Sequence, residues 1–383
     1  MMPRNNKIEV IFFEAGRSGG SVNRLIELLH TWDFNKIQVG LFTFYFTNKA
    51  AELHDNANIS FNGTFGLKNE SLPDPFVNIY GILCPTIFGI KYFIKSLSIL
   101  LWNRNATVYI NNTPYSHIPL ILAAILLDRN IICHLRDTIK FTKSEKYLIK
   151  YVSKFVVLSN AGKQHYIRQG ILADKIEVIY DSINFTKINL HNRRVANSGK
   201  ISAVVVGSLV SRKRQDICIK AFERVIERCK NAELLIVGDG DQRQELVRLA
   251  NELSITTNIH FLGNVDNVGL ILSQCHIGIL VSCREGMPNS VMEYMAASLP
   301  VIVSNLPGIS ELVEDGKSGF VVPIDSVDEL TDKWIQLCND GELRGSMGTY
   351  GYEFIKSPMF SQKSEMEGII SIISSINTLN SRP

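Results

Sequence analysis

Two carboxylates flank a turn in the stretch REGMPNSVMEYM, residues 284–295. Glu285 follows an apolar strand pattern, and Glu293 lies in the first turns of the helix that the next residues predict. The glycine and proline between them favour a tight turn, and Asn289 or Ser290 can cap the helix. Backbone N–H groups at such a helix start can hold a phosphate, and carboxylates accept hydrogen bonds from sugar hydroxyls. The stretch suits a diphosphate between two sugars, as in a nucleotide-sugar; a plain helix cap with a surface glutamate is the simpler alternative.

Three consecutive cations, Arg212, Lys213 and Arg214, follow a predicted strand that ends at Gly207. Arginine forks, a lysine charge and a helix N-terminus together stabilise a diphosphate. Taken alone, the three residues also fit a solvated basic loop. Dinucleotide binding is disfavoured because no complete GxGxxG follows a strand, and a P-loop ATPase is disfavoured because GxxxxGK[ST] is missing.

Apolar strand patterns alternate with helical patterns along the chain, which predicts parallel sheets with right-handed crossovers. The fold class is therefore α/β, with two doubly wound domains whose strand ends face a shared ligand cleft. We expect domains at 1–190 and 191–360, a linker at 186–200, and a helix within 361–383 that packs back toward the N-terminal domain. Strands are predicted at 8–16, 37–45, 106–112, 131–137, 154–160, 200–209, 232–240, 259–265, 276–282, 299–304 and 319–323, and helices at 21–32, 216–229, 242–253 and 361–376.

The chain of 383 residues is long enough for two cores, and 45% hydrophobic residues provide the apolar surface to fill them. Residues 1–190 carry 21 Lys and Arg against 14 Asp and Glu, so the positive charge lies in the N-terminal half. The seven cysteines form no CxxC, which predicts reduced, buried thiols. No signal-peptide pattern is present, and the apolar stretch 117–128 is shorter than the roughly 20 residues of a membrane span. We expect a cytoplasmic protein, with 117–128 as a buried helix.

The segment from Glu285 to Glu293 matches the E-x7-E signature of retaining glycosyltransferases with the GT-B fold, and its surroundings resemble glycosyltransferase family 4. The resemblance covers nearly all of 200–340 and is carried by VVVGSLVSRKRQDICIKAFERV, AELLIVGDGDQRQELVRLA, IHFLGNVDNVGLILSQCHIGILVS and MEYMAASLPVIVSNLPGISELVEDGKSGFVVP. It implies two Rossmann-like domains facing a central cleft, with the acceptor bound by the N-terminal domain and the nucleotide-sugar by the C-terminal domain. It also implies that no metal and no cofactor beyond the nucleotide-sugar co-substrate is needed.

The resemblance assigns roles to individual residues. Glu293 would bind the ribose hydroxyls, Glu285 would contact the transferred sugar, and Lys213 with Arg212 would bind the diphosphate. The other donor-binding groups would be the loop residues Gly263 and Val265, near the base, and the backbone amides of Met287, Asn289 and Ser290. The sequence departs from the family pattern at Ser208, His276 and Met287, which leaves the identity of the donor open.

The N-terminal domain contributes a glycine-rich loop and one histidine. Gly16, Gly19 and Gly20 lie between a strand and a helix and let the backbone approach a phosphate or the acceptor closely; a flexible turn is the alternative. His134 stands near the end of the predicted strand 131–137. By the resemblance it would lie beside the reacting carbon of the donor, although a structural role is commoner for an isolated histidine. The predicted catalytic set is Glu285, His134 and Lys213.

Basic residues alternate with aromatic and aliphatic ones in 88–104 and 139–154, and ten basic face three acidic residues across 88–155. Such a surface can adsorb to anionic lipid, so peripheral membrane contact is expected here; a core helix with a solvated lysine face is the alternative. Nucleic-acid binding is disfavoured because no module motif is present.

Residues and resemblance together predict a retaining, hexosyltransferase-type enzyme at the cytoplasmic, inner face of the membrane. It would move a sugar from a UDP-sugar to a glycan hydroxyl on a lipid-linked intermediate, in the synthesis of a cell-surface polysaccharide such as lipopolysaccharide or capsule. Two alternatives stay open. One is a nucleotide-sugar 2-epimerase of the same fold, which needs no acceptor, and the other is a non-catalytic binding or assembly subunit.

Overall fold

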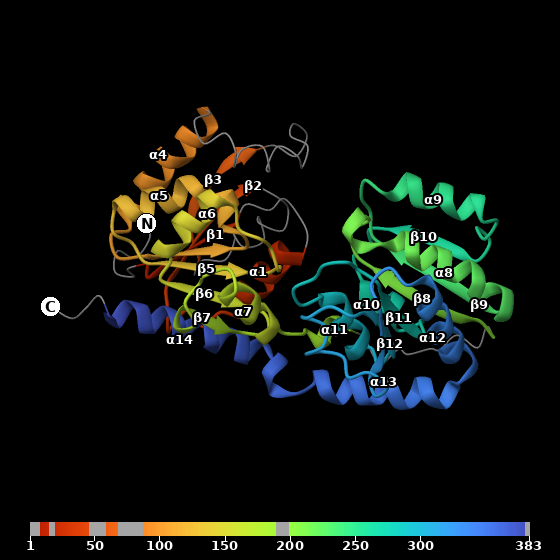
Figure 1. Ribbon diagram of the computed structural model, residues 1–383. Coiled ribbons are helices and arrows are strands. Elements are labelled where there is room, and N and C mark those ends of the chain that lie inside the picture. Colours follow the sequence, from red (N-terminus) through yellow and green to blue (C-terminus); the bar gives the residue numbers. More distant parts are fainter. Residues whose placement is uncertain (1–7, 15–19, 46–58, 68–86, 189–198, 380–383) are drawn as a thin grey trace. The chain divides into compact units, whose positions relative to one another are not determined.

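The computed structural model describes residues 8–14, 20–45, 59–67, 87–188 and 199–379 (Figure 1). The chain divides into two compact units: residues 1–180 with 362–383 form the N-terminal unit, and residues 181–361 form the C-terminal unit. This division lies ten residues before the predicted boundary between 190 and 191. Most of the predicted linker, 189–198, lies outside the described residues.

The N-terminal unit is built on a parallel sheet of seven strands in the order β3-β2-β1-β4-β5-β6-β7. Its central strands are short and buried on both faces, as parallel strands covered by helices are. The strands are β1 (Val10–Glu14), β2 (Val39–Tyr45), β3 (Ile59–Leu67), β4 (Thr107–Asn111), β5 (Ile131–Leu135), β6 (Lys154–Val157) and β7 (Ile176–Val178).

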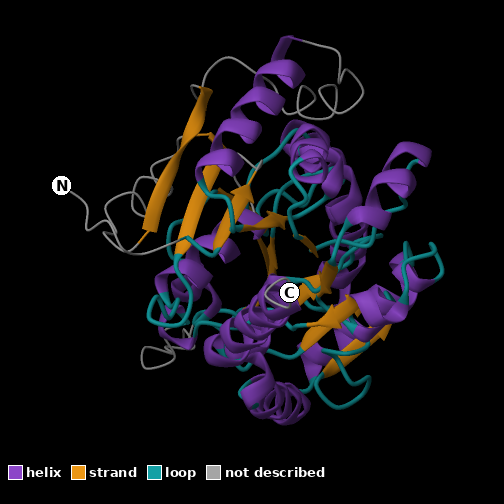
Figure 2. Cartoon of the chain, turned by 90° about the vertical axis from the view of Figure 1, so that its left-hand side faces the viewer, coloured by secondary structure: helices purple, strands orange, loops and turns teal. Residues whose placement is uncertain are grey.

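Helices cover both faces of this sheet, and each face has its own core. On one face Tyr92, Leu120 and Tyr166 come from three helices and pack with the strands, whereas Leu29 and Ile373 pack on the other face. Figure 2 shows the strands gathered into sheets with helices outside them. The helices are α1 (Gly20–His30), α4 (Ile87–Trp102), α5 (Ile118–Leu126), α6 (Lys143–Leu148), α7 (Asn160–Ile167) and α14 (Gln362–Leu379), with 3-10 turns η1 (Pro114–His117), η2 (Ile149–Tyr151) and η3 (Ala173–Lys175).

The C-terminal helix α14 belongs to the N-terminal unit. Arg24 of α1, which is buried, donates to Glu365 of α14 at 2.9 Å and to Glu27 at 2.7 Å. Thr107 at the start of β4 donates to Asn377 at 2.9 Å. Because a buried charge needs a partner, the Arg24–Glu365 pair fixes where α14 packs on this unit.

The C-terminal unit is built on a parallel sheet of six strands in the order β10-β9-β8-β11-β12-β13. Phe222 of α8 packs against Trp334 of α12 with ring centroids 5.3 Å apart, in the core on one face of the sheet. The strands are β8 (Ile201–Val206), β9 (Ala232–Val237), β10 (Ile259–Gly263), β11 (Ile277–Leu280), β12 (Val301–Ser304) and β13 (Gly319–Val322). The helices are α8 (Gln215–Arg228), α9 (Arg243–Glu252), α10 (Val268–Leu272), α11 (Asn289–Ala296), α12 (Val327–Asn339) and α13 (Gly341–Ile355), with 3-10 turns η4 (Phe185–Lys187), η6 (Ser211–Lys213) and η7 (Pro358–Phe360).

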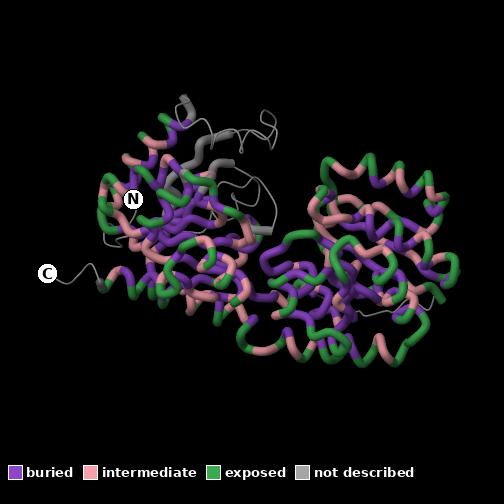
Figure 3. The backbone as a smooth tube through the Cα atoms, viewed as in Figure 1, coloured by how far each residue is buried: buried purple, intermediate pink, exposed green. Residues whose placement is uncertain are grey.

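Burial follows this layering in each unit, with buried strands and exposed outer helix turns (Figure 3). The predicted buried helix 117–128 is only half buried: Leu120 and Ile121 have no exposed surface, but Leu122 and Leu126 are exposed. Within the described ranges, no helix is both long and apolar enough to cross a bilayer.

Candidate functional site

The C-terminal sheet reverses its strand order between β8 and β11. The chain runs outward from β8 to β9 and β10, then returns to place β11 on the other side of β8. In open α/β sheets, ligands bind beyond the carboxyl ends of the strands at such a switch point. The segments that follow these two strands, 207–214 and 281–288, carry four of the predicted site residues: Arg212, Lys213, Glu285 and Met287.

Lys213 and Glu285 meet at this point. Lys213 Nζ donates to Glu285 Oε1 at 2.6 Å, and Arg212 Nη1 lies 3.4 Å from Glu285 Oε2. The side chains of Glu285 and Lys213 are only 8% and 12% exposed, whereas that of Arg212 is 37% exposed. Two cations around one carboxylate leave a positive excess, which would attract an anionic ligand.

Backbone contacts hold the two segments together. The Arg212 guanidinium donates to the carbonyl oxygen of Arg284 at 3.2 Å, and the Cys283 N–H donates to the carbonyl oxygen of Arg212 at 2.9 Å. The basic turn after β8 and the acidic turn after β11 therefore form one structural piece.

Three glycines with positive φ stand at the ends of neighbouring strands: Gly207 after β8, Gly238 after β9 and Gly263 at the end of β10. The Gly238 N–H donates to the carbonyl oxygen of Gly263 at 2.7 Å, and a Cβ at Gly238 would overlap the carbonyl oxygen of Gly207. A Cβ at Gly207 would lie 3.8 Å from Nζ of Lys213. At these three positions the strand ends carry no side chain, so a ligand can approach the backbone closely.

The turn after Glu285 differs from the sequence prediction at the helix cap. α11 begins at Asn289, and Pro288 is the N-cap residue with φ −77° and ψ 114°; no side chain caps the helix. The sequence predicted a cap at Asn289 or Ser290. Proline fits the extended N-cap conformation, so the cap lies earlier in the chain, at Pro288, and the helix already begins at Asn289. The Asn289 Oδ1 atom is buried and has no hydrogen-bond partner in the described structure. First-turn N–H groups of Asn289 and Ser290 have no acceptor within the helix, as at any helix start.

Gly308 supports this turn from outside. A Cβ at Gly308 would overlap the carbonyl oxygen of Gly286, so no other residue fits without moving the turn. Met287 and Ser290 in the same turn are buried. The turn is therefore packed into the unit rather than standing free in solvent.

Tyr294 fastens α11 to the strands of the switch point. Its hydroxyl accepts the N–H of Val206 in β8 at 2.6 Å and donates to the carbonyl oxygen of Ile279 in β11 at 3.4 Å. Its ring packs on Gly278, where a Cβ would overlap it. Burial raises the pKa of the Tyr294 hydroxyl, which therefore stays protonated. Glu293, the preceding residue, is half-buried on α11.

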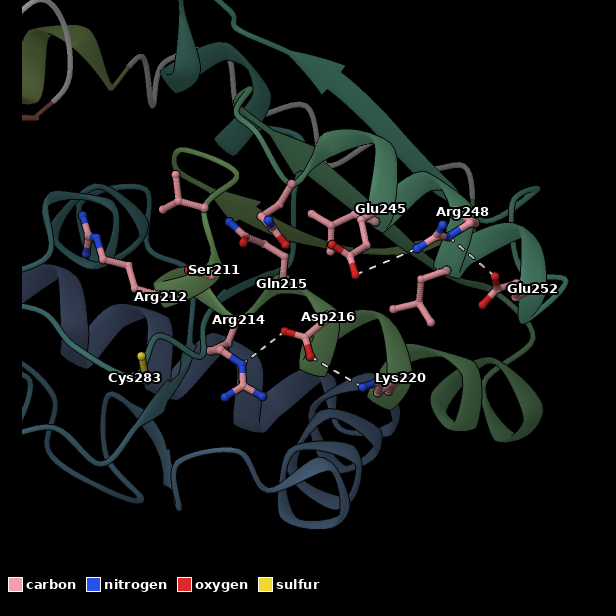
Figure 4. Close-up of a pocket in the computed structure, with 14 residues that line it drawn as sticks. Ser211, Arg212, Arg214, Gln215, Asp216, Lys220, Glu245, Arg248, Glu252 and Cys283 are labelled. Carbon is pink, nitrogen blue, oxygen red and sulfur yellow. Dashed lines mark hydrogen bonds and ion pairs between the residues drawn. The ribbon is translucent and has the colours of Figure 1, made fainter. Parts of the chain in front are cut away.

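A cavity of about 590 Å³ opens beside the basic turn (Figure 4). Arg212 lines it, but Lys213, Glu285 and Glu293 do not. Its other charges largely neutralise one another: Arg248 lies 3.7 Å from Glu252, and Lys220 lies 3.5 Å from Asp216. The positive excess is therefore at the switch point and not in this cavity.

His134 lies inside β5, one residue before its end, and its side chain has no exposed surface. Its Nδ1 atom is 2.8 Å from the Tyr109 hydroxyl, and Nε2 is buried without a partner. Burial, with Arg136 and Arg24 nearby, lowers the pKa of the imidazole well below its ordinary value, so it is neutral. The predicted contact with the reacting carbon does not fit this position, because the ring would first have to leave the core. Both faces of β5 are covered by helices, so a side chain at 134 is buried whichever face it occupies.

The N-terminal sheet has its own switch point, between β1 and β4. Glu14 and Asn111 end these two strands in register, and the Asn111 amide donates to the Glu14 carboxylate. Arg136, after β5, donates through Nε to Asn111 Oδ1 at 2.8 Å. Of the predicted glycine loop, Gly20 is the first residue of α1, whereas Gly16 and Gly19 lie outside the described residues.

The structure thus brings Arg212, Lys213 and Glu285 into contact and places Met287, Asn289, Ser290 and Glu293 on the turn and helix that follow. Gly263 stands two strands away from β8, and Val265 is half-buried in the loop after it.

Sequence reasoning missed Tyr294, Gly308 and the Glu14–Asn111–Arg136 chain. Only the last left a signal: Glu14 and Asn111 lie at the ends of strands that were predicted.

Residues 186–354 match the family model of glycosyl transferases group 1, which covers most of the C-terminal unit. The poly(ribitol-phosphate) alpha-N-acetylglucosaminyltransferase of Staphylococcus aureus is 26% identical over 223 residues, 57% of this chain. The chain spans only 44% of the length of that relative.

Two solved structures share the fold over nearly the whole chain. HepE of Anabaena, in complex with UDP and glucose, has a TM-score of 0.77 at 18% identity and covers 96% of this chain and 100% of its own. WaaG, a glycosyltransferase involved in lipopolysaccharide biosynthesis, has a TM-score of 0.73 at 16% identity over 95% of this chain and 99% of its own. The predicted fold class, α/β of the GT-B type, is confirmed.

Proposed function

We propose that the protein is a retaining glycosyltransferase, because residues 186–354 match the family model of glycosyl transferases group 1. It transfers a hexosyl group from a UDP-sugar to a hydroxyl of a glycan. The observation that carries this proposal is the contact of Lys213 and Arg212 with Glu285 at the β8–β11 switch point, beside the start of α11.

The reaction breaks the bond between the anomeric carbon and the diphosphate oxygen and forms a bond from that carbon to the acceptor oxygen. Negative charge grows on the departing diphosphate, where Lys213, Arg212 and the N–H groups that begin α11 stabilise it. The acceptor attacks on the face that the diphosphate leaves, and its proton passes to a phosphate oxygen of the leaving group. Because the acceptor attacks on this same face, the configuration at the anomeric carbon is retained although no protein nucleophile takes part.

The donor is held by groups of the C-terminal unit. Glu285 contacts the transferred sugar and Glu293 the ribose hydroxyls, while the loop at 263–265 approaches the base. The amides of Met287, Asn289 and Ser290 line the pocket for sugar and phosphate. No resident metal is required, because fixed cations and helix amides supply the positive charge.

We further propose that the acceptor is a lipid-linked intermediate of a cell-surface polysaccharide such as lipopolysaccharide or capsule. The likeness to WaaG, which takes part in lipopolysaccharide biosynthesis, supports this class of acceptor. A 2-epimerase of the same fold is the second candidate, since such an enzyme also needs a nucleotide-sugar site. Incubation with a UDP-sugar alone separates the two, because only an epimerase converts the donor without an acceptor.

The first test is a thermal shift with UDP, GDP, ADP, CMP and their sugars. UDP and its sugars should stabilise the protein in proportion to the logarithm of their concentration. Glu293→Ala should weaken this stabilisation, and the exposed Glu353→Ala serves as a matched control that leaves it unchanged. Stabilisation by another nucleotide would correct the base. No shift with any nucleotide, or an unchanged shift in Glu293→Ala, would contradict the donor site proposed here.

A further inference from the structure

Helix α4 exposes an apolar stripe on its outer side. Its inner residues, such as Tyr92 and Leu100, lie in the core of the N-terminal unit. The exposed residues of α4 include Lys91 and Ser98, but four are large and apolar, with exposed fractions of 51% for Ile90, 59% for Ile94, 51% for Leu101 and 90% for Trp102. A helix on the surface of a soluble domain normally carries polar residues there.

The neighbouring helices continue this exposed surface. α5 packs beside α4 and exposes Leu122 and Leu126, and α6 with η2 exposes Tyr147 and Tyr151. These elements share one core and therefore cover the same face of the sheet (Figures 1 and 3). We call their outward side the α4–α6 face; α14 and α1 pack on the opposite face of the sheet.

The charge of the α4–α6 face is strongly positive. Its exposed cations are Lys91, Lys143, Lys146 and Lys150, and the exposed Arg104 and Lys140 lie in the loops after α4 and before α6. Among the described residues 88–155 the acidic side chains are Asp128, Asp137 and Glu145, and Glu145 is only 3% exposed because it closes the capping box of α6. The aromatic rings and cations are interleaved: Lys150 Nζ lies 3.8 Å from the ring centre of Tyr147 and 5.1 Å from that of Tyr151.

We propose that the α4–α6 face docks on the surface of an anionic lipid bilayer. Trp and Tyr favour the interface between headgroups and acyl chains, aliphatic side chains enter it, and lysines reach the anionic headgroups. Each lysine near such a surface strengthens binding by roughly fivefold. A protein partner would not require so uniform a positive charge around the apolar stripe. Such docking is separate from the transfer reaction, but it would bring the protein to a lipid-linked acceptor.

The test is flotation of the full chain with vesicles of phosphatidylcholine containing either no or about one third phosphatidylglycerol. The protein should bind the anionic vesicles and lose that binding as salt is raised. Ile94→Gln with Trp102→Ser removes apolar contact, and Lys146→Gln with Lys150→Gln removes charge. Each double variant should reduce partitioning by at least about tenfold.

Matched controls come from residues away from this face. Leu270→Gln with Ile324→Gln changes exposed apolar residues of the C-terminal unit, and Lys230→Gln with Lys363→Gln removes two exposed lysines elsewhere. Both should bind vesicles like the unchanged protein.

Equal affinity for neutral and anionic vesicles, or equal losses in controls and test variants, would overturn the proposal. The proposal would also be overturned if the protein did not bind vesicles and instead formed a dimer that the Ile94 and Trp102 substitutions dissociate. Nucleotide binding measured on the same variants keeps this outcome separate from a failure of the donor site.

Discussion

The ammonium of Lys213 lies 2.6 Å from the carboxylate of Glu285, although 72 residues separate the two in sequence. Each residue follows one of the two strands at the switch point of the C-terminal sheet. Both side chains are nearly buried, so their contact offsets part of the hydration that each charge loses. Their contact places a cation and an anion side by side where a nucleotide-sugar would present both phosphate and hydroxyl groups.

Lys213→Ala should lower kcat by about 100-fold or more, because the charge that Lys213 faces grows on the leaving diphosphate in the transition state. Steady-state kinetics with the donor found by thermal shift measure this change. Lys220→Ala, in the neighbouring cavity, is the matched control and should keep its rate. An undiminished kcat in Lys213→Ala would exclude the electrostatic role.

Gly308→Ala should displace the turn that carries Glu285, since the new Cβ would overlap the carbonyl oxygen of Gly286. We expect a loss of about 1–3 kcal/mol in the free energy of unfolding and weaker nucleotide binding, measured by denaturant titration and thermal shift. Gly345→Ala on α13, where a Cβ meets nothing within 4 Å, should instead keep or slightly raise stability. Equal behaviour of the two variants would show that the turn adapts freely.

Tyr294→Phe should cost about 1–3 kcal/mol of unfolding free energy, because the Val206 N–H loses its acceptor and the Ile279 carbonyl its donor. Chemical denaturation is the measurement. In the control Tyr350→Phe, the lost hydroxyl contacts the exposed Glu314, and the change should stay within about 0.5 kcal/mol. A neutral Tyr294→Phe would mean that ring packing on Gly278 alone holds α11 in place.

Acid should destabilise the N-terminal unit through its buried imidazoles. Burial lowers the pKa of His117 to about 3, and the pKa of His134 is also lowered. The unfolded chain binds a proton at each histidine near pH 6.5 and the folded chain does not. Stability is therefore highest above about pH 6.5 and falls as the pH drops toward 3, by about 2 kcal/mol for His117 at pH 5.

Unfolding free energies at pH 7.5 and 5.0 measure this fall. His117→Gln should reduce the difference between the two values by about 2 kcal/mol. His30→Gln, at an exposed histidine, should leave the difference as it is. The same pH dependence in His117→Gln and the unchanged protein would show that the ring becomes protonated in place.

The sequence predicted most of the strands because parallel strands buried on both faces form continuous apolar runs; β9 and β12, for example, fall within predicted segments. Two strands were missed for local reasons. β3, with the sequence ISFNGTFGL, is interrupted by asparagine and glycine, and β7 has only three residues. Both lie at the edges of the N-terminal sheet, where a long apolar run is not required.

For the candidate site, residue types were easier to predict than positions. Glu285, Lys213 and Arg212 were chosen from local motifs, and the fold brings them together. The N-cap at Pro288 and the burial of His134 depend on backbone geometry and strand facing, which motifs do not encode. The approach of Gly308 to Gly286 joins distant segments, so only the tertiary structure could reveal it.

The pairing of Arg24 with Glu365 has a consequence for biosynthesis. Because α14 lies on the N-terminal unit, the whole C-terminal unit is an insertion between β7 and the last helix of the first unit. The ribosome makes α14 after the whole C-terminal unit, so the isoleucines that it adds to this core, such as Ile369 and Ile373, arrive only after that unit has been synthesised. Until then one side of the first unit exposes apolar surface, and Arg24 lacks its Glu365 partner. The C-terminal unit is one contiguous segment and can fold earlier, so in a nascent chain the unit proposed to bind the nucleotide would be complete before the N-terminal unit is closed.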